Sequence, residues 1–269
     1  MDWSKTKTIF IIAFLVLNAF LAFQFFAKKN GSQYGIIPQA SLEGRLAAEG
    51  IIYSELPTVG EKGAIINAKT KEFTQEEIKK LKGQKFISLG EGSEEGKFPK
   101  IRMELTKPVS APTMNLQTKV NQFLREYVHN GEQYRYWRTD EELNIIICVQ
   151  QYNGKMIFQS LDNDIGMVIL YLNNKDEIYA YEQKMLVDFE EKEREQLLKP
   201  LEAIELVYNK SYLKPNSKVK IEYGYYTKYP LVDVQTLQPT WHLIVESDEG
   251  EVEDLYVHAI EGVVLQSGN

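Results

Sequence analysis

An uncharged run of apolar residues from Ile9 to Phe26 most constrains what this chain can fold into. As a helix, the run would span about 27 Å, which is close to the hydrocarbon thickness of a bilayer. Two lysines precede it and two follow it, and Trp3 lies where an aromatic ring would reach the lipid headgroups. These features predict that residues 8–27 form a single transmembrane helix.

A cleaved signal peptide is the alternative interpretation of this segment. The apolar core of a signal peptide is usually shorter than this run, and a cleavage site follows a pattern of small residues. The run instead ends in Phe25, Phe26 and Ala27, which do not form that pattern. We therefore expect the segment to remain in the protein as an uncleaved anchor.

The orientation of the anchor cannot be predicted from its flanking lysines, because they are equal in number on the two sides. Residues 1–29 carry four lysines and one aspartate, so the chain's net charge of −7 leaves −10 on residues 30–269. An anionic inner leaflet repels such an acidic region, and long domains are translocated largely regardless of charge. We expect a cytoplasmic tail over residues 1–7, with the bulk of the chain outside the cell.

One face of the predicted helix carries residues that suit contact with another membrane helix. Asn18 lies in the middle of the span, where an amide without a partner is costly. Leu15, Ala19 and Ala22 fall on the same side at helical spacing, and small residues let two helices approach closely. We predict that Leu15, Asn18, Ala19 and Ala22 form a partner-binding transmembrane face.

The composition of the remaining chain is that of an ordinary globular protein, with 43% hydrophobic and 26% charged residues. Cys148 is the only cysteine, so no internal disulfide can form. The net acidity argues against nucleic acid as a partner. Residues 28–38 contain Gly and Pro breakers and are predicted to be a tether.

Residues 39–110 are predicted to be an N-terminal α+β segment that packs on the module after it. Ser41 should cap a first helix, which Gly50 ends, and Thr74 with Glu77 forms a capping box that opens a second. Pro108 and Pro112 mark the end of the segment. The expected helices are 42–49 and 74–82, and the expected strands are 64–68, 85–89 and 100–106.

Residues 111–188 are predicted to be a first module, a helix followed by an antiparallel meander. Asn115 should cap the helix, and Asn153-Gly154 is a strong two-residue hairpin signal. Both faces of strand 143–152 are apolar, so we expect it to be central, with Cys148 as a small buried side chain. The expected strands are 134–137, 143–152, 155–161, 167–172 and 177–187.

Residues 189–269 are predicted to repeat this helix-plus-meander arrangement. The charged stretch 188–199 is expected to be a connector, and Pro200 should begin a helix that buries Leu201, Ile204 and Tyr208. The expected strands are 218–227, 241–246, 251–258 and 263–266. The predicted fold class is therefore α+β: a single N-terminal transmembrane helix followed by an extracytoplasmic region of two helix-plus-antiparallel-meander modules.

Two stretches resemble known families. MDWSKTKTIFIIAFLVLNAFLAFQFF resembles the N-terminus of the YycI (WalI) family of membrane-anchored regulators. That resemblance implies a YycH-like membrane protein and a WalK/YycG-like sensor histidine kinase as partners, contacted largely through transmembrane helices, in the control of cell-wall metabolism. PTWHLIVE and LYVHAIEGVVL are similar to the end of PepSY-type modules, except that His258 stands where Asp or Asn is commoner.

No pattern in the sequence predicts a catalytic or metal site. His242 and His258 fall on adjoining strands with no third ligand at metal-like spacing, and we expect half-exposed imidazoles on a sheet face. The third histidine, His129, ends a helix. The acidic stretches LDNDIG and SDEGEVED lack the ligand spacing of a calcium loop and are predicted to be hairpin turns. We expect a protein that is not an enzyme and has no cofactor.

Three functions therefore compete. The first is a membrane-anchored regulator that acts through its transmembrane helix and an extracytoplasmic surface. The second is an anchored cell-wall enzyme whose site follows no recognised pattern, and the third is a passive scaffold for envelope proteins. Whether regulation activates or inhibits depends on which state of the kinase is bound better, and the sequence does not predict it.

Overall fold

The computed structural model describes residues 3, 7, 14–18, 20–22, 41–88, 96–111, 114–231 and 233–267. The chain divides into two compact units, Met1–Leu46 and Ala47–Asn269. In the first unit, residues 14–18 and 20–22 are helical. Much of the predicted transmembrane helix 8–27, and all of the tether 28–38, lie outside the described residues. Among those described, no helix is long and apolar enough to cross a membrane.

Helix α2 (Leu42–Ala48) begins as the sequence predicts. The Ser41 hydroxyl accepts a hydrogen bond from the backbone N–H of Gly44, 3.2 Å away. After the helix, Gly50 has a φ of +70°, the left-handed conformation that favours glycine after a helix end. The predicted cap and the predicted stop are both confirmed.

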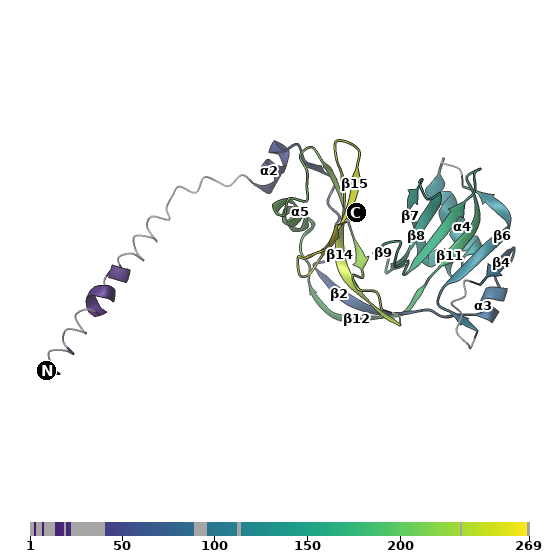
Figure 1. Ribbon diagram of the computed structural model, residues 1–269, viewed down its shortest axis with the longest axis horizontal. Coiled ribbons are helices and arrows are strands. Elements are labelled where there is room, and N and C mark those ends of the chain that lie inside the picture. The colour runs from purple at the N-terminus through teal and green to yellow at the C-terminus, as the bar shows by residue number, and fades with distance from the viewer. Residues whose placement is uncertain are drawn as a thin grey trace. The chain divides into compact units, whose positions relative to one another are not determined.

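The second unit is organised around one large sheet, with helices that cover parts of it (Figure 1). The helices are α3 (Gln75–Lys79), α4 (Leu116–Tyr127) and α5 (Pro200–Asn209), with a 3₁₀ turn at Gly131–Gln133. The strands before α4 are β1 (Ile52–Tyr53), β2 (Lys62–Thr70), β3 (Phe73–Thr74), β4 (Gln84–Ile87), β5 (Lys97–Phe98) and β6 (Ile101–Ser110). Between α4 and α5 lie β7 (Tyr134–Asp140), β8 (Ile145–Tyr152), β9 (Lys155–Phe158), β10 (Met167–Leu172), β11 (Glu177–Gln183) and β12 (Leu186–Gln196). The last strands are β13 (Lys218–Tyr226), β14 (Val234–Glu246), β15 (Val252–His258) and β16 (Val264–Ser267).

The strands of the large sheet fall into two groups. The first group is antiparallel and runs β7-β8-β10-β11-β6-β4. The second group has β13, β14, β15 and β16 in order, with β2 and β12 added along the start of β14. Strand β9 joins the groups, because it forms a hairpin with β8 and a parallel pairing with β13.

Strand β8 is central, as its apolar residues on both faces predict. Ile146 and Cys148 belong to the core that lies under α4, together with Val120, Phe123 and Leu124 of that helix. Ile145, Ile147 and Val149 point to the opposite face and form a second buried cluster. Because strand side chains alternate between faces, one strand supplies both cores.

The turn between β8 and β9 also follows the sequence. Asn153 and Gly154 have φ angles of +48° and +73°. Positive φ at both central residues is what a type I′ hairpin turn requires.

At the start of α4, by contrast, the predicted cap is wrong in detail. Asn115 adopts φ +59°, and its side chain makes no capping hydrogen bond.

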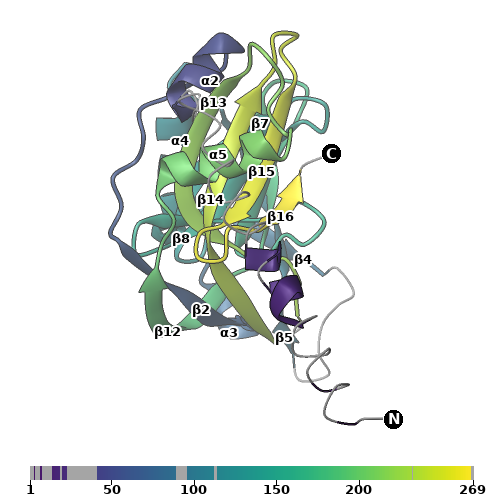
Figure 2. The ribbon, with the colours of Figure 1, turned by 90° about the vertical axis from the view of Figure 1, so that its left-hand side faces the viewer.

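Helix α5 covers part of the second group of strands, against β14 (Figure 2). Pro200 is its first residue, as predicted. The buried positions are Ala203, Ile204 and Val207, so only Ile204 of the predicted stripe is fully buried. Leu201 and Tyr208 are half-buried, and Ala203 and Val207 lie on the buried face instead.

The charged stretch 188–199 is not a connector, and this prediction is wrong. It forms most of β12, an edge strand paired with β2. The predicted strand 177–187 accordingly divides, with β11 ending at Gln183 and β12 beginning at Leu186. Charged side chains are common on edge strands because they discourage pairing with other chains. The partner strand is distant in the sequence, so no local pattern marks the pairing.

Two strands continue through proline, beyond the predicted limits. Strand β6 contains Pro108, where the pairing with β11 is irregular between Glu104 and Val109. Strand β14 begins seven residues before the predicted start and contains Pro239, which lies opposite Tyr225 of β13. Proline cannot donate a ladder hydrogen bond, so it is placed at irregularities and strand edges.

The predicted N-terminal segment 39–110 contributes to both groups of strands. Strands β4 and β6 pair within the first group. Strand β2 pairs with β12 and β14 in the second, and β1 pairs with β13. The two predicted helix-and-strand repeats are therefore held together by the segment that precedes them.

We expect Gly224→Ala to destabilise the protein by at least about 2 kcal/mol through overpacking. A Cβ atom at this position of β13 would lie 2.5 Å from the Phe158 ring and closer still to the carbonyl oxygen of Met156. Both neighbours belong to β9, so the strain falls where the two groups of strands join. Chemical denaturation of the full chain in detergent measures the effect.

Gly60→Ala is the matched control, because its nearest neighbour would be 3.9 Å away. We expect a change within about 0.5 kcal/mol for that exposed site. Equal stabilities for the two variants would contradict the close approach of β9 and β13 at Gly224.

Candidate functional site

Three of the four residues predicted to form a transmembrane face lie among the described residues. Leu15, Asn18 and Ala22 are helical and exposed, whereas Ala19 lies outside the described part. The large apolar side chains of this segment are between 51% and 66% exposed. They are Phe14, Leu15, Val16, Leu17, Phe20 and Leu21. An exposed apolar patch of this kind is typical of a membrane or partner contact.

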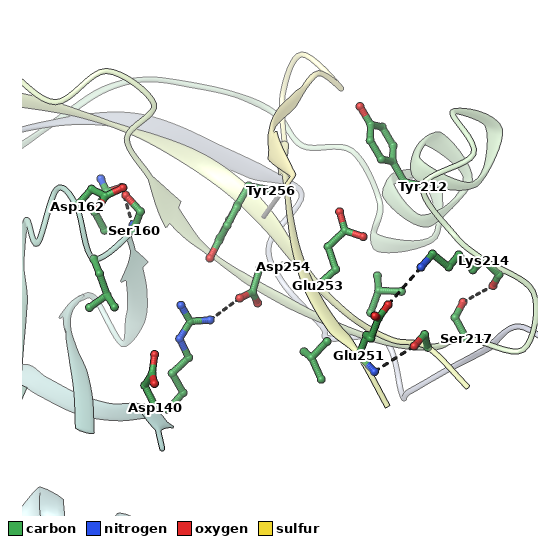
Figure 3. Close-up of a pocket in the computed structure, with 16 residues that line it drawn as sticks. Asp140, Ser160, Asp162, Tyr212, Lys214, Ser217, Glu251, Glu253, Asp254 and Tyr256 are labelled. Atoms are coloured by element: carbon green, nitrogen blue, oxygen red, sulfur yellow. Dashed lines mark hydrogen bonds and ion pairs between the residues drawn. The ribbon is translucent and has the colours of Figure 1, made fainter. Parts of the chain in front are cut away.

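A groove of about 680 Å³ lies in the second unit, between β7 and the segment after β9 on one side and β15 on the other (Figure 3). Its size is within the range of ordinary ligand pockets. Carboxylates outnumber cations along its walls by five to two, so the groove is acidic. The charged residues are Asp140, Asp162, Glu251, Glu253, Asp254, Arg138 and Lys214.

One ion pair crosses this groove. The Arg138 guanidinium of β7 donates to Asp254 Oδ2 of β15 at 2.5 Å, and the guanidinium also stacks on Trp137. The other oxygen of Asp254 contacts His242 Nε2 at 2.6 Å. Burial raises the pKa of the Asp254 carboxyl, but contacts with His242 and Arg138 outweigh that and lower the pKa below its usual value. The carboxylate is therefore held ionised between the two groups of strands.

The histidines of the second group are buried, so the predicted half-exposed imidazoles are wrong. His242 is 0% exposed, stacked on Tyr256 at 4.7 Å and close to Phe158 at 4.5 Å. His258 is 1% exposed. Phe158 comes from β9, and the strand pattern around His242 could not show that another group of strands covers this face.

Both imidazoles have structural partners. His242 holds Asp254, as described above. His258 Nδ1 accepts hydrogen bonds from the backbone N–H groups of Ile260 and Glu261, each 3.2 Å away. The ring thus stabilises the turn between β15 and β16. Because both rings are buried, neither is exposed to a molecule in the groove.

Cys148 and the acidic turns have no catalytic arrangement around them either. Cys148 is 0% exposed, and burial raises the pKa of its thiol well above the usual range, so the reactive thiolate does not form. In the turn 161–166, Asp164 forms ion pairs with Lys100 and Lys184. Across the described residues, no group of three or more His, Cys, Asp or Glu side chains could hold a metal ion.

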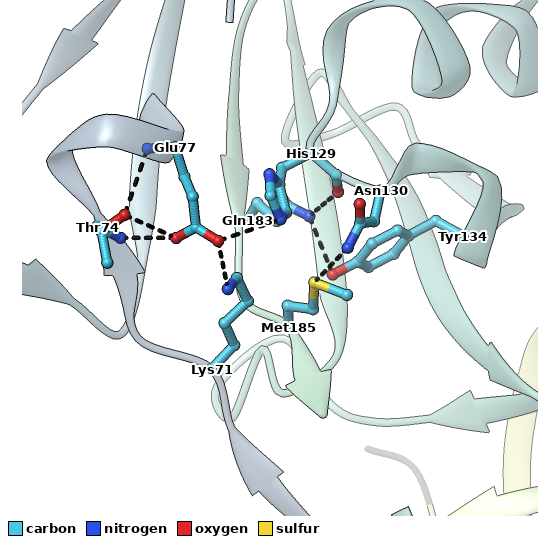
Figure 4. Close-up of polar contacts among 8 residues, drawn as sticks. All are labelled: Lys71, Thr74, Glu77, His129, Asn130, Tyr134, Gln183 and Met185. Carbon is cyan, nitrogen blue, oxygen red and sulfur yellow. Dashed lines mark hydrogen bonds and ion pairs between the residues drawn. The ribbon is translucent and has the colours of Figure 1, made fainter. Parts of the chain in front are cut away.

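A second polar cluster surrounds the start of α3 (Figure 4). Glu77 accepts from the backbone N–H of Thr74 at 2.9 Å, and Thr74 Oγ1 accepts from the backbone N–H of Glu77. This confirms the predicted capping box, although the helix ends at Lys79 rather than at residue 82. Lys71 Nζ lies 2.8 Å from Glu77, and His129 lies 3.9 Å from it.

Two pKa values in this cluster are shifted downward, for different reasons. Burial raises the pKa of Glu77, but the hydrogen bonds from Lys71 and Thr74 outweigh it and bring the pKa to about 2. Burial also lowers the pKa of His129, in spite of the nearby carboxylate. At neutral pH, Glu77 is therefore ionised and fixes Lys71 against the start of α3.

Sequence reasoning did not find the residues that cross the groove. Arg138 and Asp254 belong to β7 and β15, which do not pair with each other in the sheet. Because side chains alternate between the two faces of a strand, Asp254 and Tyr256 lie on the same face of β15. This alternation was the signal in the sequence that could have placed them together. Nothing in the sequence identifies the cation opposite them.

A family model described as YycI protein matches residues 31–260. No curated protein matches the chain. Among solved structures, the chain is similar to an uncharacterized protein from Eubacterium rectale ATCC 33656 at 10% sequence identity and a TM-score of 0.48. The alignment covers 79% of this chain and 88% of that one.

Acid should remove the contribution of Glu77 to stability. Its pKa is lower in the folded state than its ordinary value of 4.5, so the contribution is complete above pH 4.5 and is lost as the pH falls toward about 2. We expect Glu77→Gln to cost about 1 kcal/mol at pH 7, the usual value of a helix cap, and much less at pH 2. Denaturant unfolding at a series of pH values measures this.

Glu76→Gln is the control for that experiment, because Glu76 lies in the same first turn and is exposed. Its effect should be small at every pH. A Glu77→Gln effect that does not shrink in acid would contradict the role of the ionised carboxylate.

Chelator and calcium should both leave the melting temperature of the full chain unchanged. A bound ion stabilises the folded state by mass action, so its removal or addition would shift the transition. Thermal unfolding in EDTA and in calcium chloride tests this. A shift of several degrees in either condition would reveal an ion site.

Proposed function

The chain belongs to the YycI family, and on this basis we propose that it is a non-enzymatic, membrane-anchored regulator of a WalK/YycG-like sensor histidine kinase. In this role it acts with a YycH-like membrane protein in the control of cell-wall metabolism. The family match over residues 31–260 is the observation that carries the proposal. A regulatory role needs binding surfaces and no reaction chemistry.

The proposed location is the cell membrane, crossed once by residues 8–27. The tail 1–7 is cytoplasmic, and residues 28–269 are extracytoplasmic. The uncharged run from Ile9 to Phe26 supports this arrangement by its length. The exposed apolar side chains from Phe14 to Leu21 support it as well, because they would lie in lipid or against another helix.

The proposed contact with membrane partners is the face formed by Leu15, Asn18, Ala19 and Ala22. Without a hydrophobic driving force in lipid, helices associate through close packing at small residues and through hydrogen bonds between polar side chains. Ala19 and Ala22 supply the small residues, and Asn18 supplies the polar group. The extracytoplasmic part supplies a further surface for the YycH-like partner.

The buried histidines argue against the alternative of an anchored cell-wall enzyme. His242 and His258 are both buried, and one ring nitrogen of each is held by a structural contact. A wall-lysis assay with the full chain separates the enzyme from the regulator. A passive envelope scaffold is the remaining alternative, and replacement of residues 8–27 by an unrelated anchor would leave its function intact.

We expect Asn18→Leu and Ala22→Leu to weaken co-purification with the kinase and to change kinase output several-fold. The first removes the hydrogen-bonding amide, and the second adds bulk where the helices approach. Both substitutions place an apolar leucine in the transmembrane segment, so membrane insertion should be unaffected. Pull-down from membranes and a reporter of kinase output measure the two effects.

Leu17→Ile, on another side of the helix, is the matched control and should behave as the wild type. All four proteins must be compared at equal amounts in the membrane. Equal output and equal co-purification for the three variants would exclude this face as the contact. Binding would then belong to the extracytoplasmic part.

A further inference from the structure

The loop that follows β13 presents apolar side chains to solvent at residues 228–231, which we call the apolar tip. Tyr229 is 73% exposed and Leu231 is 61% exposed, and Pro230 between them is exposed as well. Single exposed apolar side chains are common on protein surfaces. Several of them in one short loop are typical of a contact with a membrane or with another protein.

Buried glutamine side chains hold the apolar tip in place. The Gln235 amide is 1% exposed, accepts a hydrogen bond from the Leu231 backbone N–H at 3.1 Å, and donates one to the Leu231 carbonyl oxygen. Before the tip, the buried Gln159 amide donates to the carbonyl oxygen of Thr227, 3.1 Å away. The Leu231 side chain is therefore exposed although the backbone on both sides of it is fixed.

The side chains of the apolar tip are those found where proteins meet the surface of a membrane. A tyrosine ring has an apolar body and a polar hydroxyl, and it is enriched at the level of the lipid headgroups. The Lys228 ammonium lies 5.5 Å from the centre of the Tyr229 ring. A lysine can bury its stem in apolar surroundings and keep its charge among the headgroups. Pro230 fixes its own φ angle, so little order is lost when the tip makes a contact.

The charge around the apolar tip also suits a lipid surface. Residues 30–269 carry a net charge of −10, and an anionic membrane repels most of such a chain. Residues 226–231, by contrast, include one lysine and no carboxylate. Val234 beside the tip lies opposite Lys69, whose ammonium is 3.2 Å from Asp188, so that pair adds no net charge. The tip is therefore a place where this acidic chain can approach lipid.

A membrane suits the apolar tip better than a protein partner does. A specific protein interface buries about 800 Å² on each partner, which is more than the side chains of one short loop supply. Contact of a few side chains with lipid is weak alone, but an anchor in the same chain makes it an intramolecular event. A fully extended tether over residues 28–38 would span roughly 40 Å at most. The nine-residue strand β13 is shorter, at roughly 30 Å, so the tether is long enough for either end of it to reach lipid.

We propose that the apolar tip inserts Tyr229 and Leu231 into the headgroup region of the membrane that carries the anchor. The proposal rests on the anchoring by residues 8–27 proposed above, and the experiment tests the two separately. A second point of contact besides the anchor restricts how the second unit can turn above the lipid.

The test places the environment-sensitive fluorophore NBD on a cysteine introduced at the apolar tip, Leu231→Cys. The full chain is reconstituted into vesicles of phosphatidylcholine and phosphatidylglycerol in equimolar mixture. Cys148 is 0% exposed, so labelling is confined to the introduced cysteine. Lipid with a nitroxide on the acyl chain, near the headgroup, quenches a fluorophore that enters the membrane. We expect the Leu231→Cys reporter to lose about half of its emission in this lipid, as suits insertion at the headgroup boundary.

Two reporters at residues of nearly the same exposure are the controls. Phe14→Cys, at a 66% exposed residue of the proposed anchor, should be quenched whether or not the tip binds. Val252→Cys, at a 64% exposed residue, should keep its emission. Val252 lies opposite Glu246, which pairs with Lys218, so it is at the end of the sheet where β13 begins and the tip is at the end where β13 stops.

A second substitution in the Leu231→Cys protein tests the side chains of the tip. Tyr229→Ser removes the aromatic ring and should reduce the quenching about twofold. Ile52→Ser is the matched control, because Ile52 is also exposed and lies beside Lys218 at the far end of β13. Both replaced side chains are exposed, so neither change should affect folding.

The pattern of quenching decides the outcome. Quenching at Phe14 and Leu231, but not at Val252, would establish contact of the tip with lipid. Quenching at Phe14 alone would overturn the proposal and leave the anchor in place, and quenching at neither Phe14 nor Leu231 would overturn both. Equal quenching at Leu231 and Val252 would show that the whole surface adheres to lipid and would overturn the proposal. An unchanged Tyr229→Ser protein would overturn it as well, because the fluorophore itself would then account for the insertion.

Discussion

The pairing of β9 with β13 is the interaction on which the sheet of the second unit depends. Only three residue pairs form it, from Gly224 and Met156 to Tyr226 and Phe158. Through them, the antiparallel strands around α4 and those around α5 become one sheet. Gly224 is required there because the β9 backbone and the Phe158 ring occupy the space of a side chain.

This junction also places the groove. Phe158, at the end of β9, packs against His242 and Tyr256 of the second group, and Trp137 of the first group lies beside it. The aromatic contacts set how far β7 is from β15, and the Arg138–Asp254 pair bridges that gap. If one partner moved away, the other charge would be left poorly solvated. The Arg138–Asp254 pair therefore constrains the distance between β7 and β15.

Local features of the sequence predicted much of the fold, and the larger errors concern long-range pairing. The hairpin at Asn153-Gly154 and the capping box of Thr74 and Glu77 are correct, because a short stretch of residues determines each. The charged residues of β12 form a strand only because β2, more than a hundred positions earlier, lies beside them. In the candidate site, the burial of His242 likewise depends on the distant strand β9, and Arg138 has no local mark. The transmembrane face stays a prediction, because it rests on the length, polarity and helical spacing of a segment whose Ala19 lies outside the described residues.

The burial of titratable side chains limits which of them could take part in a reaction. Of the side chains suited to neutral-pH chemistry, His242, His258 and Cys148 are enclosed by packing, and His129 is half-buried beside Glu77. Among the described residues, carboxylates along a groove and the apolar side chains of a helical segment near the N-terminus are accessible. These accessible surfaces are suited to the binding of partners, which the proposed regulatory role requires.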